Sequence, residues 1–169
     1  ELGRHAAQIL LIADDLDDRT RYLNVRNTLL ALLHMQVIPI INENDTVAVD
    51  ELLTTFGDND RLAAMVAGLF TRPALIILSD VEGVYDRDPS LPDAQVLHTI
   101  AQVDQGVFNL AVNRSTGISK GGMASKLKAA QFVTQSGAAV IIAGGRVEQV
   151  LTRLVAGEEL GTIFLPNSR

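Results

Sequence analysis

The chain has 169 residues, a formal net charge of −6, no cysteine and few aromatic residues (4%). This length fits one domain, and the absence of cysteine excludes disulfides, zinc–thiolate sites and a thiol nucleophile. The acidic charge disfavours nonspecific binding to nucleic acid, and no apolar run reaches the roughly 18 residues that span a bilayer. We therefore expect a cytoplasmic protein with a core of Leu, Ile, Val and Ala, and neither a nucleic-acid nor a membrane partner.

Strands and helices are expected to alternate along the chain. Apolar runs predict strands at residues 8–13, 37–41, 74–78, 138–143 and 161–165. Amphipathic or apolar periodicity predicts helices at residues 19–35, 60–70, 122–135 and 147–156, and a short helix near Val107. The acidic residues 14–18 suit a loop and a helix N-terminus, while Asp58 or Asn59 is the expected N-cap of the 60–70 helix. This alternation predicts an α/β fold, a three-layer α/β/α sandwich with a mainly parallel sheet.

Two of these elements carry a specific burial prediction. The 37–41 strand is apolar at every position, which is typical of a parallel strand buried on both faces. The 19–35 helix presents a broad apolar face that is expected to pack on the sheet. Its members are Tyr22, Leu23, Leu29, Leu30, Leu32 and Leu33.

Polar clusters follow three of the predicted strands. They are Asn42-Glu43-Asn44-Asp45, Ser79-Asp80 and Gly144-Gly145. In sheets of this kind ligands bind beyond the carboxyl ends of the strands. Asn and Asp after a strand are also ordinary turn residues, so the first cluster alone is a weak signal. The loop after Asp80 contains Tyr85 and either walls a nucleobase pocket or is a long surface loop.

Residues 120–126 combine glycines, a helix start and two lysines. Gly121 and Gly122 lead into the predicted helix, whose free N–H groups and dipole favour an anion such as a phosphate. Lys126 lies about one turn into the helix and can reach back to that anion. The segment is not a Walker A loop, because Met123-Ala124 replaces Lys-Ser/Thr. The alternative is a glycine turn before a helix with solvated lysines.

Three polar side chains, Asp58, Asn59 and Asp60, crowd the start of the 60–70 helix. Capping requires only one of them, which leaves two to hold a ligand or to orient a lysine. The histidines His5, His34 and His98 have no ligand spacing, and no separate metal motif is found. A Mg²⁺ ion is expected only with a nucleotide, held mainly by the phosphate oxygens.

These segments resemble the amino-acid kinase family in their residues and in their order along the chain, in particular the members that phosphorylate glutamate. The resemblance covers nearly the whole chain. It rests on Arg19 to Leu29, Val37 to Asp45, Gly57 to Asp60, Ser79 to Tyr85, and Gly121-Gly122-Met123 with Lys126. It implies a carbamate kinase-like fold and transfer of the ATP γ-phosphoryl group to the γ-carboxylate of L-glutamate. The product is glutamyl 5-phosphate, in the first step of proline biosynthesis.

The resemblance also implies roles for individual residues. Asp45, Asn59 and Asn44 are expected to bind glutamate, and Asp60 to orient catalytic lysines. Lys126 is expected to stabilise charge on the transferring phosphoryl group. The nucleotide site is expected to contain Ser79, Asp80, Tyr85, Lys120, Gly121, Gly122, Met123, Ala124, Ser125 and Lys126. Two positions depart from the family pattern: Ser79 stands where Thr is common, and Lys120 stands where a small hydroxyl residue is often found.

Members of this family open with a strand that carries a Lys-Gly-Ser motif, and many bacterial members end with a small β domain of the PUA type. Neither is recognisable here, and the chain does not begin with Met. Residues 1–169 are therefore expected to be a partial kinase domain, its nucleotide-binding part. The family also implies a homo-oligomer, a dimer or tetramer, with the 19–35 helix as a contact element.

Two alternatives stay open at this point. One keeps the fold and changes the acceptor to acetylglutamate, aspartate, carbamate or UMP, against which the Asn-Glu-Asn-Asp segment argues. The other is a non-catalytic nucleotide-binding or assembly module, which the absence of the Lys-Gly-Ser strand favours.

Overall fold

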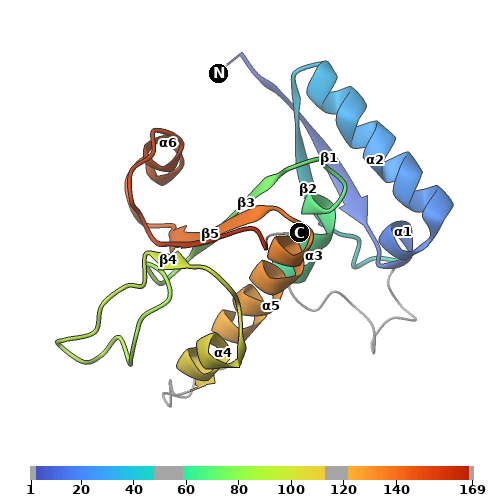
Figure 1. Ribbon diagram of the computed structural model, residues 1–169. Coiled ribbons are helices and arrows are strands. Elements are labelled where there is room, and N and C mark those ends of the chain that lie inside the picture. Colours follow the sequence, from blue (N-terminus) through green and yellow to red (C-terminus); the bar gives the residue numbers. More distant parts are fainter. Residues whose placement is uncertain (1–2, 48–58, 113–121, 168–169) are drawn as a thin grey trace. The chain divides into compact units, whose positions relative to one another are not determined.

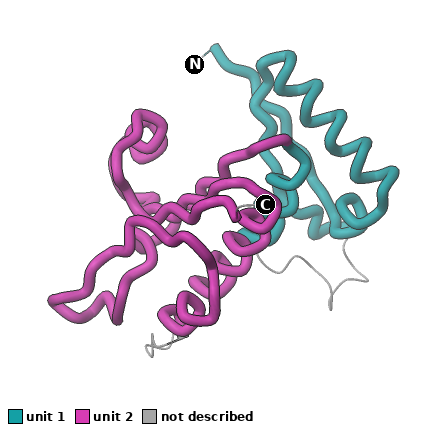
Figure 2. The backbone as a smooth tube through the Cα atoms, viewed as in Figure 1, with its two compact units in different colours: residues 1–70 teal, residues 71–169 magenta. Residues whose placement is uncertain are grey.

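The computed structural model describes residues 3–47, 59–112 and 122–167. The chain divides into two compact units, Glu1–Phe70 and Thr71–Arg169 (Figure 2). Unit 1 contains β1 (His5–Leu11), α1 (Asp14–Asp17), α2 (Arg19–His34), β2 (Val37–Glu43) and α3 (Asn59–Ala67). Unit 2 contains β3 (Ala74–Ser79), β4 (Thr99–Ile100), α4 (Gln105–Val112), α5 (Gly122–Gln135), β5 (Ala139–Gly144), α6 (Val150–Val155) and β6 (Thr162–Phe164) (Figure 1). None of the helices in these ranges is long and apolar enough to cross a membrane.

Unit 1 is a strand–helix–strand unit with a further helix. β1 and β2 pair in parallel, with Ile9 opposite Ile41, and α2 runs beside them in Figure 1. The acidic residues between β1 and α2 form the short helix α1 and the cap of α2. The Asp18 side chain accepts a hydrogen bond of 2.9 Å from the backbone N–H of Arg21. This confirms the predicted helix N-terminus, since a carboxylate satisfies an unpaired N–H and suits the dipole there.

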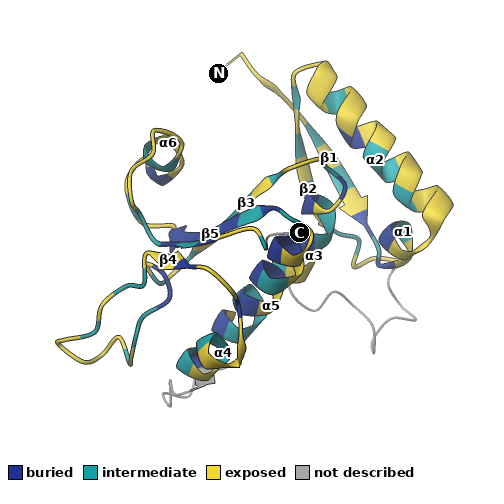
Figure 3. Cartoon of the chain, viewed as in Figure 1, coloured by how far each residue is buried: buried dark blue, intermediate teal, exposed yellow. Residues whose placement is uncertain are grey.

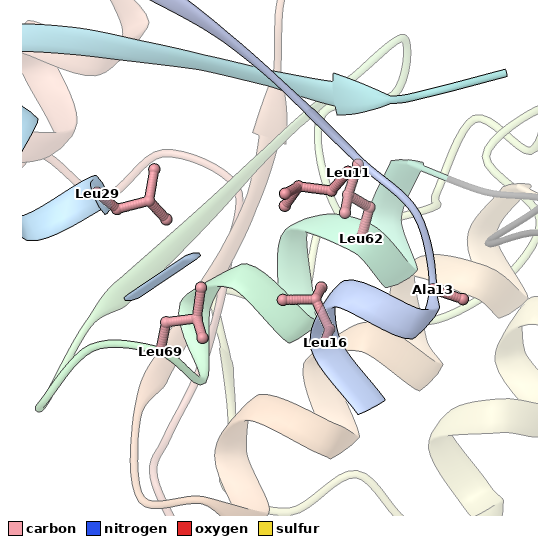
Figure 4. Packing of buried hydrophobic residues seen from close by; sticks show 6 residues of the cluster. All are labelled: Leu11, Ala13, Leu16, Leu29, Leu62 and Leu69. Atoms are coloured by element: carbon pink, nitrogen blue, oxygen red, sulfur yellow. The ribbon is translucent and has the colours of Figure 1, made fainter. Parts of the chain in front are cut away.

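The core of unit 1 lies on one face of the β1–β2 pair. Figure 4 shows its buried members, which are Leu11, Ala13, Leu16, Leu29, Leu62 and Leu69. Ile9 and Ile41 point to the same side as Leu11 and pack against this cluster. Both α2 and α3 therefore cover the same face of the two strands.

The burial predictions for β2 and α2 are partly wrong: one face of β2 and most of the apolar side chains of α2 are not buried. Ile38 and Ile40 of β2 are 50% and 55% exposed, because side chains alternate along a strand and the described helices cover only one face. On α2 only Leu29 is buried, while Leu23, Leu30 and Leu33 are exposed, and Figure 3 shows the helix as largely exposed. The described part of unit 1 thus leaves apolar side chains uncovered.

Unit 2 is built on a four-stranded sheet in the order β3-β5-β6-β4. β3 pairs with β5 and β4 pairs with β6 in parallel, and the β5–β6 pair is antiparallel. α5 packs on β5 and buries Met123, Leu127, Ala130 and Val133 (Figure 3). The predicted α/β fold with mainly parallel pairing is confirmed.

Most element boundaries in unit 2 agree with the sequence. α5 has the predicted bounds, and Gly137, with φ of +88°, turns the chain into β5. β6 lies in the predicted 161–165 segment. α6 is shorter than predicted and begins only at Val150, because residues 145–149 form turns and Gln149 has a left-handed backbone (φ 54°).

Candidate functional site

The carboxyl ends of β3 and β5 lie side by side in unit 2. Ser79 is opposite Gly144, and the backbone N–H of Gly145 donates to the Ser79 carbonyl at 2.7 Å. A Cβ on Gly145 would lie 3.4 Å from that carbonyl oxygen, an ordinary contact distance, so the hydrogen bond itself holds the two strand ends together. The Ser79 hydroxyl donates to Asp80 Oδ1 at 3.1 Å, and this pair is exposed. A hydroxyl and a carboxylate therefore stand at the sheet edge where ligands of α/β folds bind.

The loop after Asp80 has an ordered hydrogen-bonding pattern. Tyr85 forms an antiparallel bridge with Val96, and the N–H of Leu97 donates to the Val84 carbonyl at 2.8 Å. Tyr85 is half-buried, and its hydroxyl donates to Glu82 Oε2 at 3.4 Å. The two arms of the loop thus hold each other, and Tyr85 has a defined place near the end of β3.

The tip of this loop is held by a charged pair. Asp86 Oδ1 accepts from the backbone N–H of Gln95 at 2.9 Å, and Arg87 Nε donates to Asp86 Oδ2 at 3.0 Å. Arg87 also pairs with Asp93 at 2.5 Å. The Gln95 N–H and then the Arg87 guanidinium hold the pKa of Asp86 below its ordinary value, because both favour the ionised carboxylate.

The start of α5 is the predicted phosphate site. Gly122 is its first residue, is exposed, and has open space where a Cβ would stand. Lys126 lies four residues later on the same face, and side chains of a helix lean toward its N-terminus. Ala124, Ser125 and Lys126 are half-buried. Met123 is 4% exposed and belongs to the core, so its side chain is not available to a ligand. Lys120 and Gly121 lie outside the described residues.

The predicted glutamate-binding residues all belong to unit 1. Asn44 and Asp45 follow β2 directly, and the N–H of Asn44 donates to the Leu11 carbonyl at 2.8 Å. The Asn44 side chain accepts from the Thr46 hydroxyl at 2.7 Å, while Asp45 is exposed. These bonds describe a turn that holds Asn44 and leaves the Asp45 carboxylate at the surface.

Asn59 and Asp60 form the first turn of α3, which packs on β2. Asn59 is exposed and Asp60 is half-buried. Asn59 is the first residue of the helix itself, and Asp58, the other expected N-cap, lies outside the described residues. An acidic side chain in the first turn is favourable to the helix dipole.

The opposite end of α3 is tied to α2 by two side chains of the Arg19–Leu29 segment. Arg26 Nε donates to the Leu69 carbonyl at 3.0 Å, and the Tyr22 hydroxyl donates to the Gly68 carbonyl at 3.1 Å. Carbonyls at a helix C-terminus lack intrahelical partners, so these bonds satisfy them. Both residues lie in the segment that carries the family resemblance, but the sequence did not predict this contact. The one hint is that Tyr22 and Arg26 are one turn apart and therefore lie on the same side of the helix.

The candidate site residues thus fall into two groups. Unit 2 brings together Ser79 and Asp80 and continues into the loop with Tyr85, and it also contains the start of α5. Unit 1 places Asn44 and Asp45 after β2 and Asn59 and Asp60 on the helix that packs on β2. Within the described ranges, no group of three or more His, Asp and Glu side chains could enclose a metal ion.

Comparison with known proteins gives a family and close relatives. A model of the amino acid kinase family matches residues 1–144. The chain is 52% identical over 167 residues to the glutamate 5-kinase of Pseudomonas fluorescens (strain Pf0-1) and 49% identical over 167 residues to that of Rhodopirellula baltica. These alignments cover 98% and 99% of this chain but 44% and 43% of the relatives. The chain therefore spans less than half the length of these curated relatives.

Solved structures share the fold. A UMP kinase from Bacillus anthracis aligns with a TM-score of 0.58 and 13% identity, over 99% of this chain and 61% of its own. The T. acidophilum isopentenyl phosphate kinase aligns with a TM-score of 0.54 and 19% identity, over 96% of this chain and 60% of its own. At these identities the likeness concerns the fold alone, and it confirms the predicted fold class.

Proposed function

Since the chain belongs to the amino acid kinase family, we propose that it is part of a glutamate 5-kinase. The reaction transfers the γ-phosphoryl group of ATP to the γ-carboxylate of L-glutamate and gives glutamyl 5-phosphate, the first step of proline biosynthesis. The observation that carries this proposal is sequence identity: the chain is about 50% identical to curated glutamate 5-kinases over nearly its whole length. The chain itself is proposed to be a partial kinase domain that includes its nucleotide-binding part.

Unit 2 is proposed to bind ATP. The exposed Ser79–Asp80 pair and Tyr85 border the nucleotide at the carboxyl end of β3. Residues 120–125 supply backbone N–H groups to the phosphates, since a helix start is electropositive and glycine lets an anion approach closely. The exposed, unobstructed position of Gly122 supports this role. The buried Met123 contributes through its backbone only.

Unit 1 is proposed to bind glutamate. The exposed Asp45 carboxylate suits the α-amino group, and the amides of Asn44 and Asn59 suit the α-carboxylate or the amino group. Asp60 is proposed to orient the catalytic lysines by its negative charge. The short bonds that fix Asn44, and the packing of α3 on β2, support a preformed arrangement of these side chains.

Lys126 is proposed to act on the reacting phosphoryl group. In phosphoryl transfer the protein mainly positions the substrates and neutralises charge that develops on the equatorial oxygens. An ammonium group one turn into α5 can supply that charge. Mg²⁺ is proposed to bind mainly through the nucleotide phosphates, as is usual for this ion in phosphoryl transfer. When bound, it neutralises phosphate charge.

The intact protein is proposed to be a cytoplasmic homo-oligomer, with α2 as a contact element. The exposed side chains of Leu23, Leu30 and Leu33 on α2 support this role, because uncovered apolar surface favours association.

The test compares two lysines of α5 in the intact enzyme that contains this chain. Lys126→Ala is expected to lower kcat by about 10²–10³-fold, the cost of removing one charge-stabilising group. Lys128→Ala is the matched control, because Lys128 lies on the same helix but is exposed and has no proposed role. Near-normal turnover of Lys126→Ala would remove Lys126 from the mechanism. Calorimetry with ATP and Mg²⁺ tests binding itself, and an intact protein that binds no ATP would contradict the proposal.

A further inference from the structure

Thr162, the first residue of β6, is a fully buried polar residue whose hydroxyl bonds to a distant segment. Its exposed fraction is 0%, and its Oγ1 accepts a hydrogen bond of 2.8 Å from the backbone N–H of Val84. Among the described residues one other polar residue, Thr134, is buried, with an exposed fraction of 2%. The Thr134 hydroxyl donates to the Gln131 carbonyl within its own helix. Thr162 is therefore the buried hydroxyl that joins two elements.

The loop after β3 lies directly on this hydroxyl. A Cβ added to Gly83 would stand 2.7 Å from Thr162 Oγ1 and 2.9 Å from Val96 Cγ1, so no side chain fits there. Gly161, just before Thr162, has φ of +73°, and a Cβ on it would stand 2.1 Å from the Ile142 carbonyl oxygen. Two glycines thus let β6 and the loop approach each other and β5 closely.

The contact holds the part of the loop that carries the nucleotide residues. Val84 is 1% exposed, and its carbonyl accepts from Leu97 N–H, so its two backbone groups join β6 to the second arm of the loop. Tyr85 follows Val84 directly, and Asp80 lies four residues before Val84. A shift at Val84 therefore moves Tyr85.

We propose that Thr162 is a positioning residue for the nucleotide site, acting through the Val84 N–H on the loop that bears Asp80 and Tyr85. This inference rests on the proposed function of that loop. Thr162 is buried and touches no substrate. Without its oxygen the Val84 N–H would be buried and unpaired, and the loop would relieve that cost by moving toward water.

The test uses Thr162→Val, which keeps the shape and removes the acceptor, and Thr162→Ser, which keeps the acceptor. In the intact enzyme Thr162→Val is expected to raise the KM for ATP by about tenfold. This is the size of effect expected from the loss of one buried hydrogen bond. The KM for glutamate is expected to stay within about twofold, because that site is assigned to other elements. Thr162→Ser is expected to restore the ATP KM. Thr134→Val is the matched control, because it removes a buried hydroxyl whose bond stays within α5.

A folded Thr162→Val enzyme with an unchanged ATP KM would overturn the proposal while leaving the proposed function intact. A wild-type protein that binds no ATP would overturn both. If Thr162→Val does not fold, amide hydrogen exchange on the wild type and on Thr162→Ser decides. The Val84 amide is expected to be strongly protected in both, and fast exchange in either would overturn the proposal.

Discussion

Replacement of Leu29 by alanine tests how strongly the one buried side chain of α2 anchors this helix in the core of unit 1. Leu29 is fully buried, and it packs in the cluster with Leu11, Leu62 and Leu69 (Figure 4). Leu→Ala removes three carbons, which at about 0.8 kcal/mol per methylene gives about 2.4 kcal/mol of lost transfer free energy. The cavity left behind raises the loss of unfolding free energy to about 3–5 kcal/mol.

The assay is urea unfolding followed by tyrosine fluorescence in a Tyr85→Phe background. The chain has two tyrosines and no tryptophan, so Tyr22, which packs against this cluster, then reports on unit 1 alone. With a urea dependence of about 1–3 kcal/mol per molar, the expected loss lowers the midpoint by about 1 M or more. The control is Leu30→Ala, the next residue of α2, which is 38% exposed and should cost no more than about 1.5 kcal/mol, with no enclosed cavity to add to it. Equal losses for the two variants would refute the assigned burial of α2.

Two further predictions concern hydrogen bonds at the surface of each unit. Arg26→Met should lower the unfolding free energy of unit 1 by about 1.5–3 kcal/mol, since it removes a charged donor from the Leu69 carbonyl. Arg21→Met, which removes only an exposed ion pair, should cost less than about 1 kcal/mol, and the reverse order in urea unfolding would be inconsistent with the α2–α3 tie. The lowered pKa of Asp86 means that its contribution to stability is present above the ordinary value of 3.8 and is lost as pH falls through the folded value. Asp86→Asn should therefore show a smaller fall in Tm than the wild type between about pH 4 and pH 2, and an identical fall would contradict this reading.

The sequence predicted elements well wherever a local pattern determines them. α5 has the predicted bounds because glycines stand at both its ends and its apolar side chains repeat with a helical period. The pairing of β4 with β6 was not predicted, because two residues carry no period and the partner is far along the chain. Burial of β2 was predicted on both faces, whereas Ile38 and Ile40 are exposed, because apolar composition does not say which face the described helices cover.

The candidate site residues also differ in whether a local sequence pattern could predict them. Ser79, Asp80 and Lys126 could be named from short motifs, because a strand end and a glycine-led helix start have local signatures. The hydrogen bond between Thr162 and Val84 joins residues that are 78 positions apart, and no local sequence pattern predicts such a contact. The tie from Arg26 to the Leu69 carbonyl is hidden for the same reason.

The proposed acceptor is the central claim, and trapping of the acyl phosphate tests it most directly. The intact enzyme is incubated with ATP, Mg²⁺ and hydroxylamine, and hydroxamate formation is measured with L-glutamate, N-acetylglutamate and aspartate, while ATP turnover is measured with carbamate and UMP. We expect the γ-hydroxamate of glutamate, with the other acceptors near background. No hydroxamate from glutamate, or faster turnover with another acceptor, would contradict the assignment.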